Sequence, residues 1–181
     1  MTDRTPEAIT QQTSIAEADR LLRIGPVIVH RDDSLERLAT LAVVNTGCRV
    51  LSVADHDGRL IGVIPVRVLV NDIFLKVVPE EFLGEIQDYE AALKYAEHVG
   101  ARTAADIMLD PVSVHPHETV RDAFARMHEH RLNGVPITDA GERVVGYIDQ
   151  LELLIVWLRA TGRDNLLRPD GHPEHERQGG R

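Results

Sequence analysis

Histidine and cysteine are among the side chains of this chain that could hold a metal ion or attack a substrate. The 181 residues include nine histidines and one cysteine. The pairs His115/His117 and His128/His130 are each spaced two apart, and on a helix this spacing points two rings to different faces. His30 and His115 stand at matching points of the chain, where we expect a surface position or a helix start. The spacing therefore predicts no bound metal.

Catalytic motifs are also missing from the sequence. It has no Gly-x-Ser-x-Gly turn, no Walker-type glycine-rich loop and no His-Glu-x-x-His pair. Cys48 has no neighbours that would activate its thiol, and as the single cysteine it cannot form an intrachain disulfide. We therefore expect a protein that is not an enzyme.

The charge balance bears on possible partners. Twenty Lys and Arg against 29 Asp and Glu give a formal net charge of −9, so the overall field repels nucleic-acid backbones and anionic membranes. The polar start, Met1 to Ser14, does not resemble a secretory signal. The longest apolar run, Leu153 to Leu158, is far shorter than the roughly 20 residues that span a bilayer. We expect a cytoplasmic protein without nucleic-acid binding or membrane insertion.

The chain repeats itself. Pro26–His30 matches Pro111–His115 at every position but one, at an offset of 85 residues. Farther on the offset becomes 84, and Arg59–Gly62 lies over Arg143–Gly146. Self-similarity at a nearly fixed offset indicates a tandem duplication.

Each repeat has the same order of expected elements, strand, helix, strand, strand and helix. Ser34 and Thr119 are expected to cap the two first helices, and Asp122 completes a variant of the capping box with Thr119. The expected strands are Val27–Val29, Val50–Val53 and Leu60–Ile64, then Val112–Val114, Val135–Thr138 and Val144–Ile148; the second helices are Val66–Lys76 and Gln150–Arg159. A repeat of about 50 residues cannot bury its sheet alone, so the two should pack together as an α/β fold.

The duplication divides the chain into five parts. We assign residues 1–21 to an N-terminal arm, 22–70 to the first repeat, 71–103 to an aromatic and acidic helical insert, 104–160 to the second repeat and 161–181 to a disordered tail. Residues 80–98 of the insert have an apolar stripe at helical spacing. This stripe fits either a connector packed on the sheet or a partner, or a lid over a ligand cleft.

The second repeat resembles the cystathionine-β-synthase (CBS) domain family, through Gly134-Val135-Pro136-Ile137-Thr138-Asp139 and the run Val144-Val145-Gly146-Tyr147-Ile148. With the more diverged first repeat it would form a tandem CBS pair, or Bateman module. The resemblance implies two β-α-β-β-α repeats related by a pseudo-twofold axis. It also implies clefts that bind adenosyl ligands such as AMP, ATP or S-adenosylmethionine, with no required cofactor.

The resemblance also assigns residues to the second-repeat cleft. Where the family has a Gly-h-h-Thr/Ser-x-x-Asp motif, Glu152 stands in place of the aspartate that takes the ribose hydroxyls, and Asp149 replaces the hydroxyl that meets phosphate. A carboxylate repels phosphate, so Asp149 favours a neutral or cationic adenosyl ligand, or Mg²⁺ as a bridge. The expected adenine surround is Val112, Asn133, Gly134, Val135 and Pro136. Loss of Glu152 should abolish ligand stabilisation and leave folding intact.

The first repeat departs further from the family. Pro65 stands at the hydroxyl position and Val68 at the ribose position, so neither polar contact can form. Arg67 remains as a residue that could reach a phosphate. We expect this cleft to bind no nucleoside through the family contacts.

The predicted function is a regulatory sensor of an adenosyl ligand that acts on a separate effector protein. The apolar run Leu153–Leu158 predicts a homodimer contact, or else packs on the insert of the same chain. Two alternatives stay open. The module could be a ligand-free interaction module with degenerate pockets, or a sensor of divalent cations.

Overall fold

The computed structural model describes residues 9–77 and 102–163. Most of the predicted insert, including the expected helix over 80–98, and the tail from residue 164 lie outside the described residues. In the described part, no helix is long and apolar enough to cross a membrane.

The first repeat forms a three-stranded sheet backed by two helices. Its elements are β1 (Ile28–His30), α2 (Leu35–Val44), β2 (Val50–Ala54), β3 (Leu60–Pro65) and α3 (Val66–Val77). Strand β2 is central, parallel to β1 and antiparallel to β3. The Ser34 side chain accepts a hydrogen bond from the N–H of Arg37, so the predicted cap of α2 is confirmed.

The second repeat keeps this order with a weaker first strand. Its elements are α7 (Val120–Glu129), β4 (Gly134–Thr138), β5 (Val144–Asp149) and α8 (Gln150–Ala160). The expected strand Val112–Val114 is reduced to one parallel bridge between Val114 and Ile137. The capping box of Thr119 and Asp122 is present.

Two short helices, α1 (Ile15–Asp19) and α6 (Ala104–Ile107), join the repeats reciprocally. Helix α1 precedes the first repeat and is tied to the second, where the N–H of Ile15 donates to the Glu118 carbonyl at 2.8 Å. Helix α6 opens the second repeat and is tied to the first, where the N–H of Ala104 donates to the Asp33 carbonyl at 2.9 Å. Each repeat is thus hydrogen-bonded to the short helix that leads into the other repeat.

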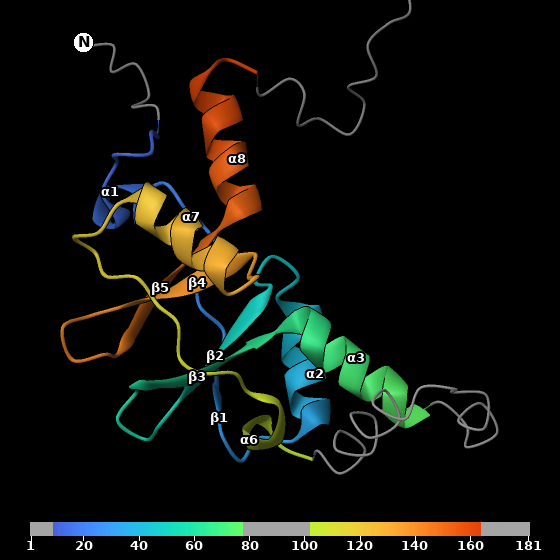
Figure 1. Cartoon of the computed structure of the whole chain (residues 1–181). Coiled ribbons are helices and arrows are strands. Elements are labelled where there is room, and N and C mark those ends of the chain that lie inside the picture. Colours follow the sequence, from blue (N-terminus) through green and yellow to red (C-terminus); the bar gives the residue numbers. More distant parts are fainter. Residues whose placement is uncertain (1–8, 78–101, 164–181) are drawn as a thin grey trace, which may run out of the picture.

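The β2–β3 turn of the first repeat contacts the β4–β5 turn, which holds the same position in the second repeat. Arg59 pairs with Arg143, its counterpart in the second repeat. On either side, the N–H of Leu60 donates to the Glu142 carbonyl at 2.9 Å, and the N–H of Val144 donates to the Gly58 carbonyl at 3.1 Å. These contacts exchange under a twofold rotation, as the predicted pseudo-twofold axis requires. Figure 1 shows the strands in the middle of the molecule, with α2 and α3 on one side and α7 and α8 on the other.

Candidate functional site

The junction of β5 and α8 is shaped by one glycine and one tyrosine. Gly134 lies opposite Asp149 in the β4–β5 ladder, and Pro136 lies opposite Tyr147. A Cβ atom at Gly134 would stand 2.1 Å from the Tyr147 hydroxyl oxygen and 2.8 Å from the Ile148 carbonyl oxygen. The absence of a side chain at Gly134 therefore makes room for Tyr147, whose pKa is raised by burial.

Asp149 caps α8 and is held by four hydrogen bonds. Its Oδ1 accepts from the N–H of Leu151 at 2.8 Å and from Nη2 of Arg49 at 2.5 Å. Its Oδ2 accepts from Nε of Arg49 at 3.1 Å and from the Tyr147 hydroxyl at 3.2 Å. Only 1% of Asp149 is exposed, so a neighbouring cation is needed to offset the cost of its burial.

That cation comes from the first repeat and was not anticipated from the sequence. Arg49 directly precedes β2, and its hydrogen bond to Asp149 raises the pKa of the guanidinium. The N–H of Arg49 also donates to the Tyr147 hydroxyl at 3.3 Å. At the offset of 84, Arg49 lies over Asn133, which was among the predicted site residues. This correspondence is the signal that could have identified it.

Glu152 lies one helical turn farther along α8 and binds backbone. Its carboxylate accepts from the N–H groups of Arg23 and Ile24, with the Ile24 nitrogen 3.1 Å from Oε1 and 3.2 Å from Oε2. These two residues belong to the α1–β1 linker, residues 20–27. Glu152 is 6% exposed. Its loss would leave two N–H groups without their acceptor, so we revise the expectation that folding stays intact when Glu152 is removed.

These contacts define a cross-repeat cluster that joins the linker, the start of β2 and the start of α8. Its members are Arg23, Ile24, Arg49, Tyr147, Asp149 and Glu152. Ser52 of β2 lies near the linker, since its N–H donates to the Val27 carbonyl at 2.9 Å. Its hydroxyl is buried and has no hydrogen-bond partner among the described residues. A buried hydroxyl in this state gains from a polar ligand atom or a water.

The other predicted site residues differ in burial and in their contacts. Val112, Val135 and Pro136 are buried, whereas Asn133 is exposed and its carbonyl accepts from the N–H of Gln150 at 3.0 Å. Arg67 is exposed, and its Nη2 donates to the Arg131 carbonyl at 3.3 Å. Arg67 therefore links α3 to the end of α7 and makes no described contact with the cross-repeat cluster.

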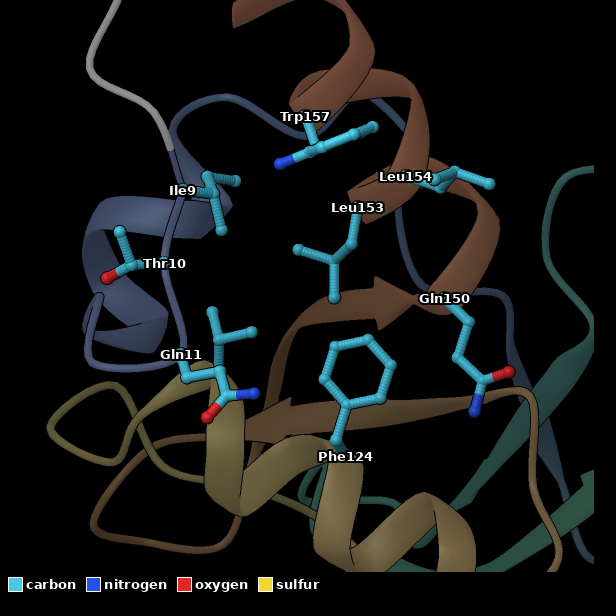
Figure 2. Close-up of a pocket in the computed structure, with 9 residues that line it drawn as sticks. Ile9, Thr10, Gln11, Phe124, Gln150, Leu153, Leu154 and Trp157 are labelled. Carbon is cyan, nitrogen blue, oxygen red and sulfur yellow. The ribbon is translucent and has the colours of Figure 1, made fainter. Parts of the chain in front are cut away.

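Two of the hollows lined by described residues lie on the second repeat. The first, of about 470 Å³, is mainly apolar and lies between the N-terminal segment, α7 and α8; Figure 2 shows Phe124, Leu153 and Trp157 around it. The second, of about 610 Å³, is more polar and lies where α7 ends and α8 begins, with Asn133 in its wall. Within residues 9–77 and 102–163, no three His, Cys, Asp or Glu side chains are grouped so that they could hold a metal ion.

Comparison with known families agrees with the repeat architecture. The model of the CBS domain matches the chain twice, over residues 18–74 and 104–158. The chain belongs to the CBS-domain family. The two matched regions correspond to the two repeats, so the chain contains a tandem CBS pair. No curated protein is similar enough to count as a match.

Solved structures of other CBS pairs share the fold. A CBS domain-containing protein of Thermotoga maritima superposes with a TM-score of 0.64 at 22% identity, over 83% of this chain and 97% of the other. The CBS pair of protein MJ0100, in complex with 5′-methylthioadenosine and S-adenosyl-L-methionine, gives 0.58 at 20% identity, over 83% and 97%. CBSX2 in complex with AMP gives 0.59 at 17% identity, over 82% and 98%. At these identities the likeness shows the fold alone.

Proposed function

We propose that this CBS pair is a non-catalytic regulatory module of the cytoplasm that senses an adenosyl ligand at the cross-repeat cluster. The supporting observation is that two carboxylates at the start of α8 reach the first repeat and its linker. Asp149 pairs with Arg49, and Glu152 accepts hydrogen bonds from the α1–β1 linker. Solved CBS pairs with this fold hold AMP, or 5′-methylthioadenosine and S-adenosyl-L-methionine. A ligand in this place would contact both repeats at once.

Glu152 is the group proposed to recognise the ribose. A carboxylate offers about four acceptor positions, and three hydrogen bonds from two backbone N–H groups occupy Glu152. Two ribose hydroxyls would compete with the linker for this carboxylate. Ligand binding would therefore loosen or reposition Arg23 and Ile24.

The linker offers a route from the ligand to a partner. It leads directly from α1, which is hydrogen-bonded to the segment just before α7, into β1 of the first repeat. If the protein binds the ligand better with the linker in one position than in another, the ligand increases the population of the first position. We propose that a separate effector protein reads this shift.

We also propose that the module acts as a homodimer through the outer face of α7 and α8. Phe124, Leu154 and Trp157 are large apolar residues on this face, and 40–50% of each is exposed. They border the apolar hollow in Figure 2. A second copy that covered this face would remove a contiguous apolar surface from water.

A second candidate function is a ligand-free interaction module. It is favoured by the internal pairing of the cross-repeat cluster, where the acidic side chains already bond to the chain itself. In this case the two carboxylates would serve only to hold the repeats together. A divalent-cation sensor has less support, because the described residues contain no cluster of three His, Cys, Asp or Glu side chains that could hold a metal ion.

Thermal unfolding against a ligand panel distinguishes these functions. The panel contains AMP, ADP, ATP, S-adenosylmethionine, NADH, cyclic dinucleotides and Mg²⁺, each nucleotide alone and with metal. A ligand at about 100 times its Kd stabilises the fold by about 2.7 kcal/mol, enough to raise the Tm by several degrees. The sensor proposal expects a rise with at least one adenosyl compound. No rise with any compound would favour the interaction module, and a rise with Mg²⁺ alone would favour the cation sensor.

A further inference from the structure

The apolar hollow between the N-terminal segment, α7 and α8 has a wall that is held in place by backbone bonds. The N-terminal segment, residues 9–13, runs along the start of α7. There the N–H of Arg121 donates to the Gln11 carbonyl at 3.0 Å, and the N–H of Val120 donates to the Thr13 carbonyl at 2.9 Å. A hollow that is formed before a ligand arrives costs less ordering when the ligand binds.

The size and the side chains of this hollow suit a small aromatic molecule. Figure 2 shows Phe124 and Trp157 on opposite sides of Leu153. The volume of about 470 Å³ lies within the range of about 300–1,000 Å³ that is typical of small-molecule sites. Phe124 is 41% exposed and Trp157 is 40% exposed, so a flat ligand could cover both rings and gain from aromatic contact and apolar burial.

The lining also indicates the charge of the ligand. Every described residue of the lining is uncharged, although the chain has a formal net charge of −9. A charged molecule would lose water here without gaining a counter-charge. The side-chain amides of Gln11 and Gln150 belong to the lining, and each can donate and accept hydrogen bonds. The hollow therefore suits a neutral molecule with one polar edge.

We propose that the apolar hollow is a second binding site, separate from the cross-repeat cluster, and that it binds a neutral, planar aromatic molecule with a polar edge. The inference does not depend on the adenosyl function, because a charged nucleotide such as AMP is not a ligand of this kind. The hollow lies on the face of the proposed homodimer. A twofold dimer brings the same concave face of two copies together, which leaves room for a small molecule. Binding in the hollow and dimerisation should therefore be linked.

Fluorescence titration with N-phenyl-1-naphthylamine, a neutral planar aromatic probe, tests the inference. Trp157 is the only tryptophan of the chain, so the intrinsic tryptophan emission reports directly on this hollow. We expect saturable binding of one probe per chain, with quenching of Trp157 and emission of the probe by energy transfer from the indole. An excess of AMP should not displace the probe.

Two variants place the probe in the hollow. Phe124→Ala removes one aromatic wall and should raise the Kd of the probe about tenfold, which corresponds to about 1.4 kcal/mol. Gln150→Glu keeps the shape of the side chain but adds a charge, and should raise the Kd by a similar factor. A glutamate in the first turn of α8 is favourable for the helix, so this variant tests the point even if Phe124→Ala fails to fold. Leu151→Ala is the matched control, a 51% exposed leucine of α8 outside the lining, and should leave the Kd unchanged.

The other outcomes would each overturn the inference. A probe that leaves Trp157 unquenched, or that binds both hollow variants as tightly as the wild type, would lie elsewhere on the protein. Trp157 emission that changes with protein concentration but not with the probe would assign the hollow to a second copy of the chain. Binding that requires deletion of residues 164–181 would assign it to the tail. None of these results would affect the proposed adenosyl site.

Discussion

At the scale of single residues, the family motif located the carboxylates but not their partners. Glu152 and Asp149 were identified because each occupies a motif position that another residue type fills in the family. Their bonds to the linker and to Arg49 connect residues more than 95 positions apart, and no local pattern encodes such contacts. The partners of these two carboxylates were therefore found only in the folded chain.

Gly134→Ala should be among the most destabilising small substitutions in the second repeat. The new Cβ would overlap Tyr147, and the nearby Ile148 carbonyl belongs to the backbone and cannot move easily. We expect a loss of about 1–3 kcal/mol in the free energy of unfolding, measured by urea denaturation. Gly25→Ala is the matched control, because a Cβ there has no neighbour within 4 Å. Equal stability of the two variants would contradict this account of Gly134.

Glu152→Ala should weaken both the fold and the ligand response. We expect it to cost about 1–3 kcal/mol of stability, since it leaves the N–H groups of Arg23 and Ile24 without their acceptor. Glu152→Gln keeps one carbonyl oxygen and should cost less. Urea denaturation gives the stability, and thermal unfolding with AMP gives the ligand response. A Glu152→Ala protein as stable as the wild type, with an unchanged AMP response, would show that Glu152 has neither role.

At the scale of elements, the sequence predicted the repeat order and the two helix caps. These features depend on residues close together in the chain, such as Ser34 and Thr119 before their helices. It missed α1 and α6, which are short and become stable through hydrogen bonds to the other repeat. It also predicted a full strand at Val112–Val114, where only one bridge forms.

The start of α7 should make stability depend on acid pH. Glu118 accepts two hydrogen bonds of 2.8 Å from Arg126, which lower the pKa of its carboxyl below the usual range. Since the pKa is lower in the folded state, this contribution is complete above the ordinary glutamate pKa and is lost as the pH falls through the folded value. Glu118→Gln should cost about 1 kcal/mol at neutral pH and less in acid.

Urea denaturation across neutral and acid pH measures this effect. Glu129→Gln makes the same change at an exposed position, the last residue of α7, and should alter stability by less than about 0.5 kcal/mol. A loss in Glu118→Gln that is the same at every pH would assign the effect to packing instead of charge.

At the scale of the whole molecule, the pseudo-twofold axis relates two repeats whose surfaces have diverged. The first repeat has Pro65 and Val68 where the second repeat has the carboxylates Asp149 and Glu152. A single ligand site supported by both repeats is consistent with this asymmetry. The outer apolar face of α7 and α8 then remains for assembly.

Leu154→Glu should convert the proposed homodimer into a monomer. Leu154 is 50% exposed on α8, and a glutamate there would place a charge inside the proposed interface. Sedimentation velocity measures the change. Val145→Glu is the matched control, an apolar residue of similar exposure (53%) on β5, and should leave the dimer intact. A wild-type protein that is already monomeric, or a Leu154→Glu dimer, would contradict the proposed assembly.

The most direct test of the central claim is the change in backbone amide chemical shifts when AMP is added to the ¹⁵N-labelled protein. If AMP binds at the cross-repeat cluster, the ribose competes for Glu152, and the amides of Arg23 and Ile24 should show some of the largest shifts, together with Arg49 and Leu151. The account would be contradicted if these four amides stayed unchanged at saturating AMP, or if the shifts were confined to residues around the apolar hollow, such as Phe124 and Trp157.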